Sequence, residues 1–211
     1  MMAKRYYTVG VVLSLLVVLG ACSTKKILMP PRMDLRTVGT IGMLDFSPRA
    51  AGNLNVQASR EFLAVIHSAQ PGVPILELGN QQVVLTSLGH RVIDPAAIRA
   101  IGEQHHVDVV VVGTLDARQV KPSFRLGRAA ESVSAGAEIG GALTVRMYET
   151  RSGATIWTAS STCSEPLASI RVADGELSSV GASDPGGAEG RLVRRLVHLA
   201  TGDFWPYWVR Q

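Results

Sequence analysis

The sequence contains few cysteines and few aromatic residues. Its 211 residues include two cysteines, and Phe, Trp and Tyr together make up 5% of the chain. Two cysteines exclude a small disulfide-stapled protein and a four-cysteine zinc site. The apolar share of 46% nevertheless fits a chain that folds around a core rather than a disordered one. The length suits one domain, with room for an appendage at most.

The sequence also lacks the signatures of common catalytic and metal sites. It has no G-x-S-x-G nucleophile elbow, and the glycine-rich stretch 136–141 lacks the lysine of a phosphate-binding loop. His105 and His106 adjoin Asp108, but neighbouring histidines on a helix end point in different directions, and zinc would need a further ligand. We therefore predict no catalytic residue, no metal and no cofactor. The chain is predicted not to be an enzyme, with a hydrolase of unrecognised site as an alternative.

The apolar run near the N-terminus is too short to cross a membrane. Residues 9–19 read VGVVLSLLVVL and follow Lys4 and Arg5. As a helix this run would rise about 16 Å, whereas a hydrocarbon core is about 30 Å thick. A positive start, a short apolar stretch and small residues after it are the layout of a secretory signal. We predict that residues 1–21 are a signal peptide.

The run ends on Leu19-Gly20-Ala21-Cys22, which resembles the bacterial lipobox. The resemblance implies diacylation of the Cys22 thiol, cleavage between Ala21 and Cys22, and acylation of the new amino group. Several acyl chains, at about 0.8 kcal/mol per buried CH₂, anchor a domain stably. Ser23 follows, and by analogy with the enterobacterial sorting rule a residue other than Asp there favours the outer membrane. We predict a lipoprotein on the periplasmic face of the outer membrane.

Positive charge is concentrated in the first 36 residues. The formal charge is +4 and the pI about 9.4. The signal holds Lys4 and Arg5, and residues 22–36, the predicted lipidated tether, carry a further +3. Residues 37–211 hold 15 Lys and Arg against 16 Asp and Glu. The high pI therefore gives no support for nucleic-acid binding. The tether is either a contact for anionic headgroups or a solvated linker.

Residues 37–211 alternate between strand-like and helix-like patterns. The run VDVVVVGTL at 107–115 is continuously apolar, which predicts a central strand buried on both faces. We predict a periplasmic α/β domain: a single, three-layer-like domain with a central mixed sheet flanked by helices, plus a hairpin and a C-terminal helix. Strands are expected at 38–46, 74–78, 107–115, 140–150 and 154–162, helices at 55–69, 81–88, 96–104 and from about 185, and a loose segment at 173–190.

Four stretches carry a family resemblance. They are TIGMLDF at 40–46, AIGEQHHVDVVVVGT at 100–114, GALTVRMYET at 141–150 and SGATIWT at 152–158. Together they resemble the curli-assembly channel lipoproteins, the lipoprotein activators of penicillin-binding proteins, and the amino-terminal domain of the Tol propeller protein. Because these are fold residues, the resemblance over 38–162 implies a helix-covered sheet and a periplasmic place rather than one function. It favours an envelope accessory acting through protein–protein binding, in assembly, secretion or peptidoglycan synthesis.

The alternative is an oligomeric export pore of the curli type. Channel members send two hairpins through the membrane, and the corresponding segments here are 124–140 and 166–181. Outward residues in the first are small, and neither segment has an aromatic girdle. An extended periplasmic hairpin or a flexible loop is therefore preferred. The expected partners are the membrane, through the lipid, and an unidentified envelope protein, with a homo-oligomer as a further alternative.

Two side-chain groups at the C-terminal end remain to be assigned. Trp205, Tyr207 and Trp208 form either a partner-binding or membrane-facing surface, or a plug that closes the core. In the last helix, Leu192, Leu196 and Leu199 are expected on one buried stripe. After acylation of Cys22 the remaining thiol is Cys163, which we expect to be buried.

Overall fold

A computed structural model of the chain describes residues 25–48, 53–126, 132–173, 176–182 and 185–210. These residues form two compact units. The first is an α/β unit, Arg32–Trp205, and the second is a small ribbon whose described residues are 25–31 and 206–210. The predicted signal peptide and its cleavage site at Ala21 and Cys22 lie outside the described residues.

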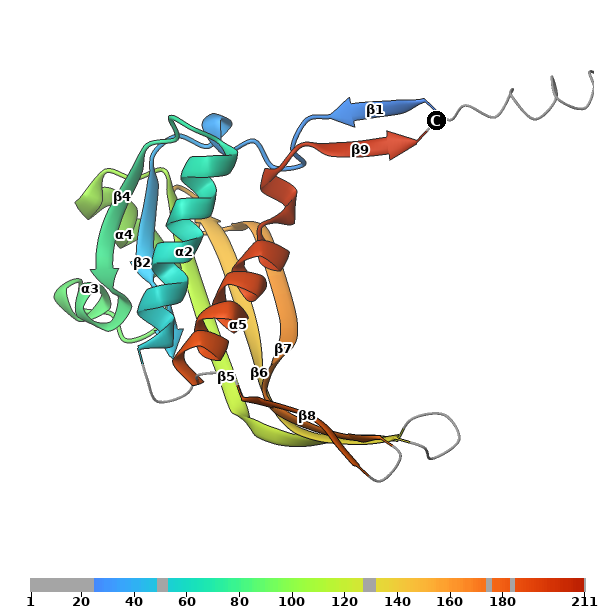
Figure 1. Cartoon of the computed structure of the whole chain (residues 1–211). Helices are drawn as coiled ribbons and strands as arrows, with labels where there is room; N and C mark the ends of the chain where they lie inside the picture. The colour runs from blue at the N-terminus through green and yellow to red at the C-terminus, as the bar shows by residue number, and fades with distance from the viewer. Residues whose placement is uncertain (1–24, 49–52, 127–131, 174–175, 183–184, 211) are drawn as a thin grey trace, which may run out of the picture. The chain divides into compact units, whose positions relative to one another are not determined.

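One mixed sheet is the framework of the α/β unit (Figure 1). Its strands follow the order β4-β2-β5-β6-β7-β8, and the short β3 pairs with β5. β2 runs parallel to β4 and β5, whereas β5 to β8 are antiparallel neighbours. The strands are β2 (Ile41–Asp45), β3 (Ser47–Pro48), β4 (Ile75–Asn80), β5 (Val109–Leu126), β6 (Ser132–Glu149), β7 (Thr155–Ala173) and β8 (Glu176–Ala182).

Helix α4 (Pro95–His105) begins and ends at identifiable capping residues. Asp94 caps α4, because its carboxylate accepts from the backbone N–H of Ala97 at 2.7 Å, and Pro95 takes the first helical position. His106 ends α4 in the left-handed conformation, at φ 54°. The helical segments are η1 (Leu35–Thr37), α2 (Leu54–Ala69), α3 (Gln81–Ser87), α4 (Pro95–His105), α5 (Pro185–Ala200) and η3 (Gly202–Phe204). The predicted α/β class, with a mixed sheet flanked by helices, is confirmed.

α2 and α5 cover one face of the sheet (Figure 1). Leu143, Val145 and Met147 of β6 are fully buried beneath them, as their alternation predicted. The aromatic residues Phe46, Phe62, Phe204 and Trp157 pack in a chain of ring contacts with centroids 4.9–6.0 Å apart. Phe204, from the C-terminal aromatic cluster, is thus part of the core.

The expected stripe on α5 is wrong at one position. Leu192 and Leu196 are buried, but Leu199 is 57% exposed. In the last turn Val197 and Ala200 pack into the core instead. Leu199 therefore lies outside the face of α5 that contacts the core.

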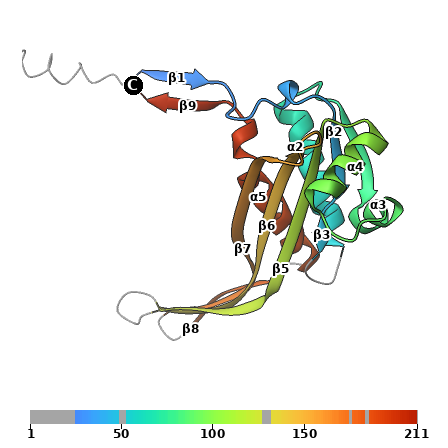
Figure 2. The same ribbon diagram turned by 180° about the vertical axis from the view of Figure 1, so that it is seen from behind.

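α3 and α4 pack on the second face, mainly over β2 and β5, with Leu78 of β4 and Tyr148 of β6 at the margins of the cluster. Leu44 and Val110 from the strands contact the buried Leu85, Ile98 and Ile101 of these helices. Val109, Val110 and Val111 are all buried, which confirms that the apolar run of β5 is enclosed on both faces. Figure 2 shows β5, β6 and β7 from this side, with no described helix in front of β6 and β7.

The antiparallel strands are longer than predicted. β5 and β6 have 18 residues each, about 60 Å of strand, whereas the 16 residues of α5 span about 24 Å. The strands therefore continue beyond the covering helix as an extended hairpin. The segment expected to be loose at 173–190 contains β8, which pairs with β7, and the start of α5. Ladder hydrogen bonds form here despite the glycine- and serine-rich composition, because they use only the backbone.

The second unit is a two-stranded antiparallel ribbon. β1 (Lys26–Met29) pairs with β9 (Tyr207–Arg210) in a register that sets Lys26 opposite Arg210. Residues 22–36, expected to be a tether, thus contain a strand. They also contain Leu35, which is fully buried in the core of the α/β unit.

Gln70 holds both chain ends of the α/β unit together. Its side chain is almost fully buried and accepts from the backbone N–H of Leu35 at 2.7 Å. The same amide donates to the carbonyl oxygens of Met33, at 2.7 Å, and Phe204, at 3.1 Å. The backbone N–H of Met33 also donates to the carbonyl oxygen of Asp203 at 3.1 Å. Residues distant in sequence thereby leave the unit side by side.

Candidate binding face of the sheet

The bare side of β5, β6 and β7 is a polar surface formed by three neighbouring strands. We call it the open face. Since successive strand residues point to opposite sides, the residues between the buried Leu143, Val145 and Met147 face outward. The open face consists of Thr114, Asp116, Ala142, Thr144, Arg146, Tyr148, Thr158, Ser160 and Thr162.

Strand register arranges the open face in rows. Thr114, Thr144 and Ser160 stand opposite one another on three neighbouring strands. The hydroxyl oxygens of Thr144 and Ser160 are 3.2 Å apart and share a hydrogen bond. Arg146 stands in the next row, opposite Thr158. The result is a surface of hydroxyl groups with one guanidinium and the carboxylate of Asp116, which offers donors and acceptors together.

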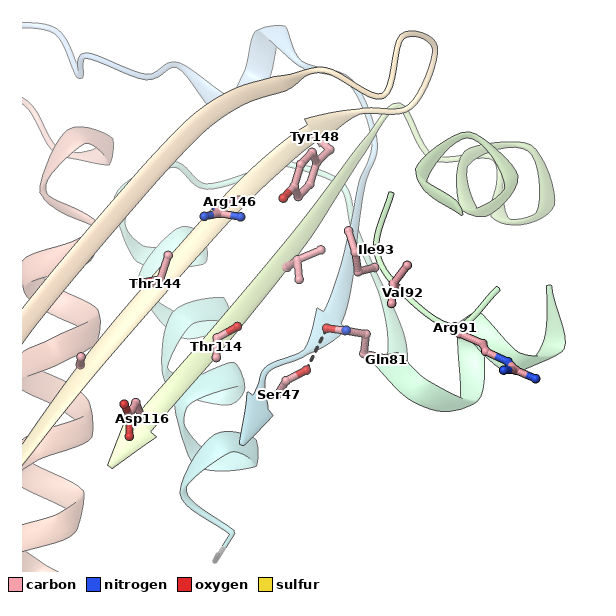
Figure 3. Close-up of a pocket in the computed structure, with 12 residues that line it drawn as sticks. Ser47, Gln81, Arg91, Val92, Ile93, Thr114, Asp116, Thr144, Arg146 and Tyr148 are labelled. Atoms are coloured by element: carbon pink, nitrogen blue, oxygen red, sulfur yellow. Dashed lines mark hydrogen bonds between the residues drawn. The ribbon is translucent and has the colours of Figure 1, made fainter. Parts of the chain in front are cut away.

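A hollow of about 590 Å³ lies at the edge of the open face (Figure 3). Tyr148 and Arg146 of β6 and Asp116 of β5 line one side of it, and Val92 and Ile93 from the segment before α4 line the other. Ser47 and Gln81 also line the hollow, where the Ser47 hydroxyl donates to the side-chain oxygen of Gln81 at 2.9 Å.

Two arginines and the carboxylate of Asp116 are the charged groups that line the hollow. Arg91 and Arg146 are exposed, and neither forms an ion pair with a residue that the structure describes. Val92 beside them is 62% exposed, so apolar and charged groups meet here. Tyrosine and arginine are among the side chains enriched at protein interfaces. This arrangement can bind a polar, partly acidic protein surface.

The three aromatic residues predicted as a partner surface fall into different units. Trp205 belongs to the α/β unit, where it is half-buried. Tyr207 and Trp208 belong to β9 in the ribbon, and Trp208 is 64% exposed. Phe204 is fully buried and Trp205 half-buried, whereas Trp208 is exposed, so the partner-surface interpretation stays a prediction.

The polar residues singled out in the sequence as metal-ligand candidates have structural contacts. The Asp108 carboxylate accepts from the backbone N–H of Thr40 at 2.9 Å, and His106 ends α4. Within the described ranges, no three His, Cys, Asp or Glu side chains are grouped as a metal ion would require. None of the helices that the structure describes combines the length and apolar character needed to cross a bilayer.

Cys163 is half-buried against α5. Its sulfur lies 3.9 Å from the carbonyl oxygen of Leu192. Burial raises the pKa of the Cys163 thiol, an effect that nearby Arg195 opposes and Glu165 reinforces. The thiol is therefore protonated at neutral pH, unlike the activated thiolate of a catalytic cysteine.

Sequence patterns located the open face only in part. The alternation over 143–148 separates buried from outward residues, but it does not say that helices leave the outward side bare. The contribution of Arg91, Val92 and Ile93 carries no local signal, since it depends on how the segment between α3 and α4 crosses the sheet edge.

Several solved structures are similar in fold. The PelC dodecamer from Paraburkholderia phytofirmans aligns with a TM-score of 0.43 and 10% identity over 86% of this chain and 96% of that chain. The C-terminal domain of LpoB from Salmonella enterica aligns with a TM-score of 0.35 and 12% identity, covering 60% and 83%. Lipoprotein GNA1162 from Neisseria meningitidis aligns with a TM-score of 0.34 and 16% identity, covering 76% and 96%.

No family model matches the chain, and no curated protein matches it in sequence.

Proposed function

We propose that this chain is a lipid-anchored accessory protein of the cell envelope that binds another envelope protein through its open face. The observation that carries the proposal is the bare side of β5, β6 and β7, opposite the side that α2 and α5 cover. The process served is assembly, secretion or peptidoglycan synthesis. The lipobox at Ala21-Cys22 supports an anchor in the outer membrane, facing the periplasm.

The composition of the open face favours a protein partner. Hydroxyl rows can pair with the backbone and polar side chains of a partner, and Arg146 can pair with a carboxylate. Val92, Ile93 and Tyr148 add apolar contact at the edge of these rows. The pKa of Cys163 is raised rather than lowered, so that thiol does not supply a nucleophile for the hydrolase alternative.

Site-specific photocrosslinking in intact envelopes tests the binding face. A photoreactive residue at Thr144 or Ser160 is expected to capture one defined envelope protein, and Arg146→Glu is expected to reduce capture at least tenfold. A photoreactive residue at Arg99, exposed on α4 away from the open face, is the control. Equal capture from position 99, or capture that Arg146→Glu leaves unchanged, would contradict the proposal.

Metabolic labelling with palmitate tests the anchor. Labelling is expected to disappear in Cys22→Ala and to persist in Cys163→Ala, because acylation needs the thiol that follows the signal. The labelled protein is expected in the outer-membrane fraction of a density gradient. Palmitate retained by Cys22→Ala would exclude lipidation at this residue.

A second candidate function is a homo-oligomeric export pore. The observation in its favour is that both candidate segments, 124–140 and 166–181, lie largely within strands. β5, β6 and β7 have 18, 18 and 19 residues, more than the 9–11 needed to span a membrane, whereas β8 has 7. Heat-resistant ring oligomers together with conductance in planar bilayers would establish the pore. A monomer that crosslinks through Thr144 and conducts no current would exclude it.

A further inference from the structure

The ribbon of β1 and β9 has one sign of charge. Residues 25–31 and 206–210 contain Lys25, Lys26 and Arg210 and no acidic residue. The register sets Lys26 opposite Arg210 and Leu28 opposite Trp208. Because alternate residues of a strand share a side, these four side chains lie on one face of the ribbon. We call this the ribbon face. Lys26, Trp208 and Arg210 line a hollow of about 460 Å³ on it.

The ribbon exposes large apolar side chains beside these cations. Trp208 is 64% and Leu28 is 53% exposed, and Val209 and Met29 on the other side are 39% and 38% exposed. An isolated two-stranded ribbon is marginally stable in water, so this pairing gains from a surface that covers its apolar groups. Tryptophan beside Lys and Arg is the combination found at the lipid–water interface. There the indole occupies the headgroup level and the cations pair with lipid phosphates.

The position of the ribbon in the chain, close to the predicted lipid anchor, favours a contact with the membrane surface. Lys26 is four residues after Cys22, so an extended chain keeps it within about 14 Å of the cysteine. Pairing then brings Arg210 from the other end of the chain to the same end of the ribbon. Three cations thus gather where the predicted anchor would enter the membrane.

We propose that the ribbon face binds the surface of an anionic lipid bilayer. Lys25, Lys26 and Arg210 contact lipid phosphates, and Trp208 and Leu28 enter the headgroup layer. The inference relies on the proposed lipoprotein function only for the distance between ribbon and membrane. It adds a second, noncovalent contact that holds the ribbon against the bilayer.

Vesicle flotation tests this contact without the lipid anchor. Residues 22–211 carrying Cys22→Ser, which keep both units, are mixed with vesicles of phosphatidylglycerol and phosphatidylethanolamine, or of phosphatidylcholine alone. We expect flotation with the anionic vesicles only, and its loss in 0.5 M salt because headgroup attraction is screened. Lys26→Gln with Arg210→Gln is expected to weaken partitioning about 30-fold, at about 1 kcal/mol for each cation removed. Trp208→Ala is expected to weaken it further.

The matched control is Arg99→Gln with Arg151→Gln, which removes two exposed cations from the α/β unit. It should float like the parent protein. Circular dichroism and thermal unfolding are expected to be the same for all variants, since the substituted residues lie outside the core.

Several outcomes would overturn the proposal. They are no binding to anionic vesicles, equal losses in the ribbon and control variants, or ribbon variants that dissociate an oligomer while vesicles bind nothing. The last result would make a second copy of the chain the occupant of the ribbon face. Palmitate labelling separates this test from the lipoprotein proposal. Palmitate labelling of the full chain without flotation of the Cys22→Ser protein refutes the ribbon contact alone. Flotation of the Cys22→Ser protein without labelling of the full chain refutes the anchor alone.

Discussion

Gly113 lies where β5 approaches the ring of Phe46 too closely for a side chain to fit. A Cβ atom at this position would overlap the ring of Phe46, which is itself fully enclosed and contacts Phe62. Neither the ring nor the strand has free space to move into, because protein interiors are packed as densely as crystals.

We therefore expect Gly113→Ala to lower the free energy of unfolding by about 1–3 kcal/mol, the usual cost of overpacking. Gly140→Ala in β6 is the matched control. The nearest atom to a Cβ there, the carbonyl oxygen of Cys163, is 3.9 Å away. Urea denaturation measures both variants, and equal stabilities would contradict this account of Gly113.

Gln70 makes three buried hydrogen bonds with backbone groups from two distant segments. Gln70→Ala would leave those groups without a partner, and we expect it to cost roughly 2–4 kcal/mol of stability. Gln70→Glu should also destabilise, because a carboxylate cannot donate to the carbonyl oxygens of Met33 and Phe204. Gln104→Ala, exposed on α4, is the comparison that should stay within about 0.5 kcal/mol of the parent in thermal unfolding.

At the scale of the element, α5 shows how a helix is held by one face. Leu196 is fully buried, and its side chain lies over Gly141, where a Cβ would be 3.0 Å from it. On the outer side, Arg191 and Arg195 reach Glu165 of β7 at 3.7 and 3.1 Å. These ion pairs are partly exposed and contribute little, so burial provides most of the attachment.

Leu196 and Leu199, three positions apart on α5, test whether burial of one face provides most of the attachment of the helix. Leu196→Ala is expected to lower the free energy of unfolding by about 2–5 kcal/mol, because it removes buried methyl groups and leaves a cavity. Leu199→Ala should change it by less than about 0.5 kcal/mol, because that side chain is already largely in solvent. Chemical denaturation that ranks Leu199→Ala as the more harmful change would show that the helix packs through a different face.

At the scale of the whole molecule, two units of very different size share one chain. The α/β unit has a long sheet with cores on both sides of β5, whereas the ribbon has four residues in each strand. The free energy of local opening is lower where few apolar contacts hold a segment, so the ribbon should open more readily than the α/β unit.

Hydrogen exchange followed by mass spectrometry should separate the units. Peptides covering 26–29 and 207–210 are expected to exchange at least a hundredfold faster than peptides covering 109–115 and 143–147. Anionic vesicles should slow the ribbon peptides and leave the others unchanged. Equal exchange rates in the two units would refute their independent stability.

The sequence by itself determined the kinds of element and much of their order. Alternation over 143–148, the apolar run of β5 and the Asp94-Pro95 start of α4 are local signals, because each follows from the geometry of a few neighbouring residues. The glycine- and serine-rich β8 escaped this reasoning, since its strand is stabilised by pairing with β7 rather than by its own residues.

Only the tertiary structure decided which surfaces are bare. The open face exists because α3 and α4 reach no further than Tyr148 of β6, and the Gln70 side chain has partners 35 and 134 residues away in sequence. β1 and β9 likewise come from opposite ends of the chain, so that Lys26 and Arg210 form one charged site. Such contacts depend on long loops closing in a particular way, which no short stretch of sequence encodes.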